Sequence, residues 1–248
     1  MTASFPKIVL LFFIYAVIGW LWETVYCSLK AKKFVYRGFL LGPYCPIYGF
    51  GVLAVLFFIE PYQKNILFLY VMSAVVVTLL EYVTSYALEK IFHTTWWDYK
   101  EVPLNINGRV ALPISLFWGV GCVAIVKWIQ PLVLKGVNQL ITEFGIGLPL
   151  LLFGLLFLDF CYSVASMNAF QKEIAKLSDE IEAKKSEINE GLSELKEEVR
   201  QKRISPSLRF NQKRMLQSYR KMNMPEIKHF KEIKALQNQK KESKKTSN

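Results

Sequence analysis

Five long apolar runs constrain the fold of this chain more than any other feature of its sequence. A helix of about 20 apolar residues crosses the roughly 30 Å hydrocarbon core of a bilayer. Within that core every backbone polar group must be paired inside the protein, which leaves helices as the structure for such runs. We therefore predict an all-α, polytopic helical membrane protein. Its five transmembrane helices are expected at roughly Phe5–Leu29, Phe39–Ile59, Ile66–Ile91, Val110–Ile129 and Ile146–Met167.

The second run is interrupted by the sequence RGFLLGPYCPIYGFG at residues 37–51. Proline removes a backbone donor and clashes with the preceding turn, so Pro43 and Pro46 should break the helix. A break at membrane depth persists only where it packs on protein or lines a wet cavity. We therefore predict a broken second span that forms the floor of a buried polar site.

The positive charges set the expected orientation. Four Lys or Arg residues lie between the first two runs, and 20 of the 31 in the chain lie in residues 169–248. Cytoplasmic loops carry an excess of Lys and Arg. We expect a multi-pass protein of the cell membrane with its N-terminus outside and its C-terminus in the cytoplasm.

The chain after the last apolar run divides into two parts. Ile174, Ile181, Ile188 and Leu195 recur every seven residues, with Phe170 and Leu177 at partner positions. This heptad pattern favours a cytoplasmic helix or coiled coil over 169–204, which follows a transmembrane domain over 1–168. A coiled coil there would also form a homo-oligomer. Residues 205–248 are basic and rich in polar residues, which predicts a disordered tail. Beside membrane spans, anionic lipid rather than nucleic acid is the expected partner of that tail.

Ionisable residues inside the apolar runs are the first candidates for a function. Glu81, Ser85 and Glu89 share one helical face, and a carboxylate within hydrocarbon is by default a functional-site hypothesis. The alternative is that Glu81 pairs with Arg37 or Arg109 and only locks the helices together. In the expected orientation Glu23, Arg37, Glu81, Arg109 and Asp159 all lie toward the cytoplasmic side, where Glu23 would neighbour Arg37. Asp159 either lines the site or hydrogen-bonds a neighbouring helix.

The break and the third loop supply further candidates. Cys45, within the break, is either a nucleophile or a packed thiol. Residues 93–108 are rich in aromatic and donor side chains, which favours either a membrane-surface belt or a lid over the site. The expected substrate-binding set is Glu23, Arg37, Cys45, Tyr48, Glu81, Ser85, Asp98, Asn105, Asn107 and Arg109.

Other chemistries find no support in the residues. The two histidines, His93 and His229, form no Cys/His or Ser/His/Asp arrangement, and no cluster has metal-ligand spacing. No GxxxxGK[ST] phosphate loop occurs, so the chain is not expected to hydrolyse ATP by that route. We therefore expect no catalytic residues, no metal and no cofactor.

Four motifs together resemble a known family: Trp22-Glu23, the broken run at 37–51, Glu81 with Glu89, and WWDY…LNINGRVAL…WG at 96–119. They resemble the bacterial putative ABC-transporter permease family called CmpB or type IV, which is similar to the vertebrate transmembrane protein 229 proteins. The resemblance covers roughly residues 5–130. It implies a polytopic helical membrane protein and an ATPase subunit as a partner.

The first functional hypothesis is therefore a permease-like transport or ligand-binding component of the membrane, with a polar pocket on the cytoplasmic side. A second is a membrane enzyme acting on lipid head groups, with Glu81 as base and Arg37 or Arg109 holding phosphate. A third is a membrane scaffold acting through its coiled coil and basic tail.

Overall fold

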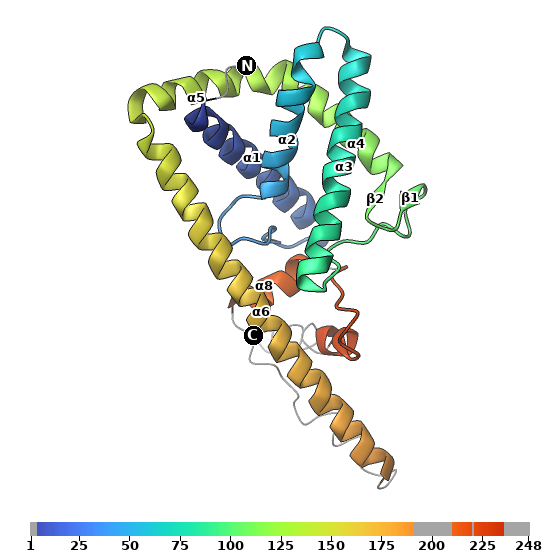
Figure 1. Cartoon of the computed structure of the whole chain (residues 1–248). Helices are drawn as coiled ribbons and strands as arrows, with labels where there is room; N and C mark the ends of the chain where they lie inside the picture. The colour runs from blue at the N-terminus through green and yellow to red at the C-terminus, as the bar shows by residue number, and fades with distance from the viewer. Residues whose placement is uncertain (1–3, 191–209, 220, 236–248) are drawn as a thin grey trace.

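The structure is a computed structural model that describes residues 4–190, 210–219 and 221–235. It is built almost entirely of helices (Figure 1). The longer ones are α1 (Phe5–Ala31), α2 (Pro46–Phe58), α3 (Ile66–Phe92), α4 (Leu112–Ala124), α5 (Gln130–Phe144), α6 (Gly147–Glu190) and α8 (Phe210–Ser218). The short elements are η1 (Glu60–Tyr62), η2 (Ile125–Ile129) and a two-stranded hairpin of β1 (Asn105–Ile106) and β2 (Val110–Ala111), in which Asn105 lies opposite Ala111.

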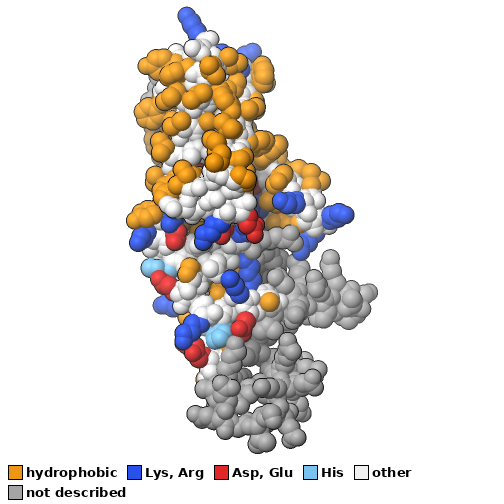
Figure 2. Space-filling model, turned by 90° about the vertical axis from the view of Figure 1, so that its right-hand side faces the viewer, with side chains coloured by type: hydrophobic (Ala, Val, Ile, Leu, Met, Phe, Trp, Pro, Cys, Tyr) orange, Lys and Arg blue, Asp and Glu red, His pale blue; other side chains and the backbone are white. Residues whose placement is uncertain are grey.

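Four helical stretches in the described ranges are long and apolar enough to cross a membrane: Phe5–Ala31, Ile66–Phe92, Leu112–Phe144 and Gly147–Ala183. Their outward faces carry many large apolar side chains, including Leu151, Phe157 and Leu158 of α6. Figure 2 shows hydrophobic side chains covering the upper part of the molecule and charged side chains gathered mainly below it. This arrangement fits an all-α membrane protein whose outer surface faces lipid.

The second predicted span, Phe39–Ile59, is helical only from Pro46. Pro46 stands in the first turn of α2, where its missing N–H costs no hydrogen bond, and Cys45 is the N-cap residue. The resulting helix has 13 residues and is only about 20 Å long, which is shorter than the apolar core of a bilayer. Residues 32–45 form an irregular loop instead.

The fourth span was expected to end near Ile129, with a short mixed segment after it. In the structure α4 continues through the π-helical turn η2 into α5, as one helical stretch from Leu112 to Phe144. Pro131 lies at the start of α5 and lacks an N–H, so the preceding turn widens rather than breaks. In Figure 1 α5 runs across the top of the molecule, and α6 then descends from its end.

Residues 32–45, 93–109, 210–219 and 221–235 gather about midway down the molecule in Figure 1, below the lower ends of α1, α2 and α3, in a region that we call the tail end. Helix α6 passes this end and extends beyond it. Its predicted coiled-coil face is buried by the chain itself. Phe170, Ile174, Leu177 and Ile181 pack in one cluster with Met215, Leu216, Met222, Met224, Phe230 and Ile233.

Residues 210–219 and 221–235, which belong to the region 205–248 predicted to be disordered, are placed and largely packed in the structure. The physical reason is that their scattered apolar side chains cover a stripe that α6 already presents. The side chains of Ile188 and Leu195, which continue the predicted heptads, lie outside the described residues.

Candidate functional site

Glu23, Arg37 and Tyr48 come from three different segments and meet at the tail end of α1. Arg37 Nε donates to Glu23 Oε2 at 3.0 Å, and the Tyr48 hydroxyl donates to Glu23 Oε1 at 2.8 Å. Only 17% of the Arg37 side chain and 26% of the Glu23 side chain is exposed. Burial opposes the charge of Arg37, but the nearby Glu23 carboxylate outweighs it and raises the pKa of Arg37 further. The predicted neighbourhood of Glu23 and Arg37 is confirmed.

The fit of Tyr48 depends on Gly19 in α1. A Cβ atom built at Gly19 would lie 2.2 Å from Tyr48 Cγ, so only glycine lets the ring lie against this helix. On its other side Tyr48 packs edge-on to Trp118 of α4, with ring centroids 5.3 Å apart. The hydroxyl that holds Glu23 is thus positioned by α1, α2 and α4 together.

Glu81 lies close to this group but has a different partner. Its Oε1 accepts a hydrogen bond from the Tyr99 hydroxyl at 3.1 Å. Burial raises the pKa of the Tyr99 phenol far above its usual value, with Glu81 and then Glu23 adding to the effect and Arg37 opposing it. Both carboxylates and Arg37 are therefore close enough to Tyr99 to change its pKa. The Glu81–Tyr99 pair and the Glu23–Arg37 pair interact electrostatically.

The hypothesis that Glu81 pairs with Arg37 or Arg109 is wrong. Arg37 pairs with Glu23, and Arg109 Nη1 lies 2.5 Å from Glu89 Oε2. The contact with Glu89 is an ion pair without the angles of a hydrogen bond, and the guanidinium also lies over the rings of Tyr82 and Tyr86. Arg109 is thus held on the face of α3 that carries Glu89. Ser85, between the two glutamates, is buried.

The third-loop candidates mostly hold the loop itself. Asp98 Oδ1 accepts from the Lys100 N–H at 2.9 Å. Asn105 donates to the Lys100 and Val102 carbonyls and accepts from the Gly108 N–H. Asn107 Nδ2 donates to the Tyr82 hydroxyl at 3.1 Å. Asp98 and Asn105 therefore organise the hairpin loop, and Asn107 joins it to α3 at Tyr82.

Asp159 of α6 binds the broken run. Its Oδ1 accepts from the Leu41 N–H at 2.9 Å and its Oδ2 from the Gly42 N–H at 2.7 Å. Oδ2 also accepts from the Tyr44 hydroxyl at 2.7 Å, and Oδ1 from the Ser163 hydroxyl at 3.1 Å. The carboxylate thereby supplies the acceptors that a loop without helical pairing needs. The sequence left open whether Asp159 lines the site or hydrogen-bonds a neighbouring segment. In the structure it hydrogen-bonds the neighbouring broken run.

Cys45 is buried at the start of α2, and its N–H donates to the Ala16 carbonyl of α1 at 2.9 Å. His93 is engaged elsewhere, with its Nδ1 2.8 Å from Glu226 Oε1. The structure thus favours the packed-thiol reading of Cys45.

Tyr99 was not among the predicted site residues. Its position in the aromatic sequence WWDY, 18 residues after Glu81, was the available signal. Arg214 and Tyr219, which reach the same neighbourhood from the C-terminal part of the chain, had no signal of this kind.

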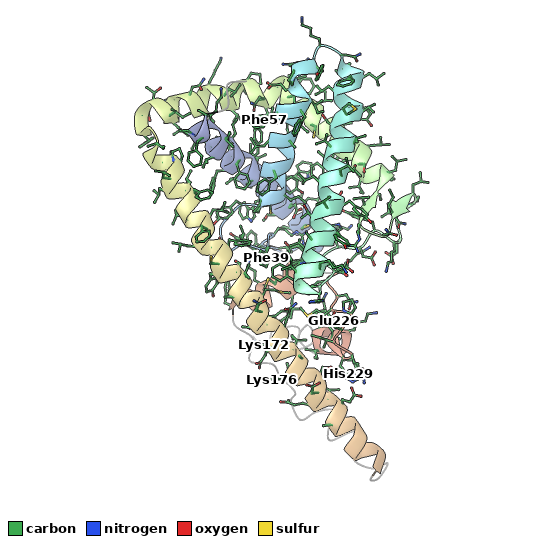
Figure 3. All side chains as sticks on the ribbon, in the orientation of Figure 1. Phe39, Phe57, Lys172, Lys176, Glu226 and His229 are labelled. Atoms are coloured by element: carbon green, nitrogen blue, oxygen red, sulfur yellow. The ribbon has the colours of Figure 1, made fainter. Side chains whose placement is uncertain are left out.

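A groove lies between α2 and α3, on the outer side of these helices. It is lined by Phe50, Leu53, Phe57, Leu79, Leu80 and Val83, and is therefore apolar rather than polar. Phe57 marks the upper end of α2 in Figure 3. The polar candidates described above are engaged with one another rather than arranged around this groove. Within the described residues, no group of three His, Cys, Asp or Glu side chains could hold a metal ion.

We call Glu23, Arg37, Tyr48, Glu81 and Tyr99 the polar centre. A family model described as putative ABC-transporter type IV matches residues 10–164, which include all five of them. No curated protein and no solved structure matches the chain.

Proposed function

The chain belongs to the putative ABC-transporter type IV family, and on that premise we propose that it is the membrane-embedded component of a transporter whose polar centre recognises a polar solute. Charged side chains within apolar helices are costly and mark substrate or ion pathways. The polar centre contains two such side chains, Glu23 of α1 and Glu81 of α3. Arg37 and Tyr99 reach them from two loops, and Tyr48 from α2.

One observation carries this proposal. Glu81 lies in an apolar helix, and its hydrogen-bond partner in the described part of the chain is the neutral hydroxyl of Tyr99. A carboxylate has about four lone-pair positions, so this one bond leaves acceptor capacity for a cationic or hydrogen-bond-donating solute. Glu23, in contrast, is engaged by both Arg37 and Tyr48. We assign solute contact to Glu81 and the positioning of α1 against α2 to Glu23.

We place the tail end in the cytoplasm. Lys30 lies in the last turn of α1 and Lys32 and Lys33 follow this helix. All three are exposed, as is Lys90 near the end of α3. This asymmetry agrees with the excess of positive charge in cytoplasmic loops. The same lysines would meet anionic head groups of the inner leaflet.

The energy for transport would come from a second chain. The sequence has no phosphate-binding loop, so ATP hydrolysis requires a separate ATPase subunit at the cytoplasmic side. The loop at 93–109 acts as the wall of the site beside α3, because Tyr99 belongs to it and binds Glu81.

The test uses the detergent-solubilised chain and a panel of small polar solutes, including amines and amino acids. We expect one chemical class to raise the unfolding temperature of the wild type and of Glu60→Gln, a control in η1 at the opposite end of the molecule. Glu81→Gln should lose this response, while its unfolding temperature without solute should equal that of the wild type. A solute that stabilises Glu81→Gln as well as the wild type would contradict the role of Glu81.

Proteoliposomes separate this proposal from the enzyme alternative. Conversion of labelled phospholipid by the purified chain alone would replace the transporter with a lipid-modifying enzyme. Co-purification of an ATPase whose hydrolysis responds to the same solute class would support the transporter.

A further inference from the structure

Residues 210–219 and 221–235, which we call the C-terminal segment, cover the tail end of the membrane helices. Arg214 of α8 donates from Nη1 to the Gly38 carbonyl at 3.1 Å and from Nη2 to the Phe39 carbonyl at 3.0 Å. Asn211 Oδ1 accepts from the same guanidinium at 3.0 and 2.8 Å and fixes its direction. The segment therefore holds the irregular loop that precedes α2.

The segment also touches the polar centre directly. Arg37 Nη1 donates to the Ser218 carbonyl, and its guanidinium lies 4.6 Å from the ring centroid of Tyr219. The Ser218 hydroxyl donates to the Tyr36 carbonyl. Arg37 is thus shared between Glu23 and the C-terminal segment.

A third set of contacts reaches the loop that carries Tyr99. Thr95 and Asn223 exchange two backbone hydrogen bonds of 2.9 Å, as in an antiparallel pair. The ring of Trp96 packs edge-on to Tyr219 at 4.8 Å, and Lys221 Nζ donates to the Asp98 carbonyl at 2.8 Å. One segment therefore joins the loop before α2 to the loop after α3.

We propose that the C-terminal segment is a latch that closes the cytoplasmic side of the polar centre. Its docking changes the contacts of Arg37, which belongs to that centre. This inference rests on the proposed function, because it assigns a regulation to the same site. When the segment is docked, Arg37 is held by Glu23 and Ser218 together, and both loops around the centre are tied to one another. When it undocks, Arg37 keeps only Glu23, and the two loops separate.

The chemistry of the interface suits a contact that opens and closes. Arg214 is buried, and its hydrogen-bond partners in the described residues, the Gly38 and Phe39 carbonyls and Asn211, are neutral. Burial lowers the pKa of its guanidinium, and the charges of Tyr219, Tyr36 and Asp159 offset only part of that effect. The apolar part of the contact uses Met215, Met222 and Met224 against α6. Methionine is the side chain best able to adapt to more than one packing arrangement.

Cys45 is a native reporter of this latch. A Cβ atom built at Gly38 would lie 3.4 Å from Cys45 Sγ, and it is the Gly38 carbonyl that Arg214 holds. Burial raises the pKa of this thiol, Glu23 adds to the effect, and Arg37 and Arg214 oppose it. Opening the latch should therefore expose Cys45 to a maleimide.

The test uses the full chain in liposomes with the other three cysteines replaced, so that mass spectrometry follows maleimide modification of Cys45. We expect Arg214→Ala to raise the rate of modification by about tenfold or more, because two charge-assisted hydrogen bonds to the loop are lost. Lys176→Ala, on the exposed face of α6 (Figure 3), should leave the rate unchanged.

A second variant covers the case in which Arg214→Ala fails to fold. Thr95→Cys with Asn223→Cys places two thiols across the backbone pair, where the separation of such a pair permits a disulfide. Oxidation should protect Cys45, and reduction of the same protein should restore its reactivity. An unchanged rate in both experiments, or failure of the pair to cross-link, would overturn the latch. Neither readout depends on a solute. If the latch experiments succeed but no solute raises the unfolding temperature, the proposed function is refuted and the latch is not.

Discussion

The carboxylate of Asp159 offers the sharpest prediction about what holds the broken run in place. Its two oxygens accept four hydrogen bonds, two from backbone amides at Leu41 and Gly42 and two from the hydroxyls of Tyr44 and Ser163. In Asp159→Asn one oxygen becomes an NH₂ donor. If that donor replaces Oδ2, the Tyr44 hydroxyl can turn and accept from it, but the Gly42 N–H cannot.

The expected cost follows from this count. A hydrogen bond to a charged group stabilises by about 1.5–3 kcal/mol, and a buried donor left without an acceptor costs about 1–3 kcal/mol. Asp159 is only partly buried, so water can relieve some of the loss. We expect Asp159→Asn to lower the free energy of unfolding by about 2–3 kcal/mol.

The assay is thermal or denaturant unfolding of the protein in detergent, together with proteolysis of the loop at residues 32–45. Ser163→Ala is the matched control, because it removes one hydroxyl donor and no backbone partner. It should cost less than Asp159→Asn, because both backbone amides keep their carboxylate acceptors. If Asp159→Asn were as stable as the wild type and its loop equally protected, the carboxylate would not be what holds the break.

Three further predictions test other contacts. Gly19→Ala should cost about 1–3 kcal/mol in unfolding experiments, because its new Cβ would overlap the ring of Tyr48; equal stability would show that the ring can move aside. Burial lowers the pKa of Lys234 to about 8, so between pH 8 and 10 the released chain holds more protons than the docked one. Hydrogen exchange should show docking of the C-terminal segment strengthening as the pH rises through this window, and Lys234→Met should remove that dependence. Gly108→Ala should loosen the β1–β2 hairpin, because φ is +68° there and a Cβ would lie 2.6 Å from Asp98 Oδ1; faster proteolysis of the loop would report it.

The membrane architecture was readable from the sequence because hydrocarbon imposes strict demands on a chain. The length of the apolar runs indicated the helices, and the prolines at 43 and 46 indicated the break. The contact between Glu23 and Arg37 followed from a short loop that returns to the same side of the membrane. Each of these conclusions depends on local composition or on a short separation along the chain.

The contacts that were missed join distant segments. Arg214 binds the Gly38 carbonyl across 176 positions, and the polar composition around it is typical of disorder. The stripe at Phe170 and Ile174 was recognised, but a heptad pattern does not say whether its partner is another copy or the same chain. Tyr99 lies in a loop rich in aromatic residues, where composition alone does not select the ring that reaches Glu81.

Helix α6 has a mechanical consequence of its own. Its 44 residues form one uninterrupted rod about 66 Å long, with Ile174 about 40 Å from the end at Gly147. A change of only about 5° in the inclination of this rod would carry Ile174 sideways by roughly 3.5 Å, which is more than the length of a hydrogen bond. A change in bilayer thickness or a neighbouring subunit could tilt α6. Such a tilt would therefore displace the surface of α6, around Ile174, on which the C-terminal segment packs.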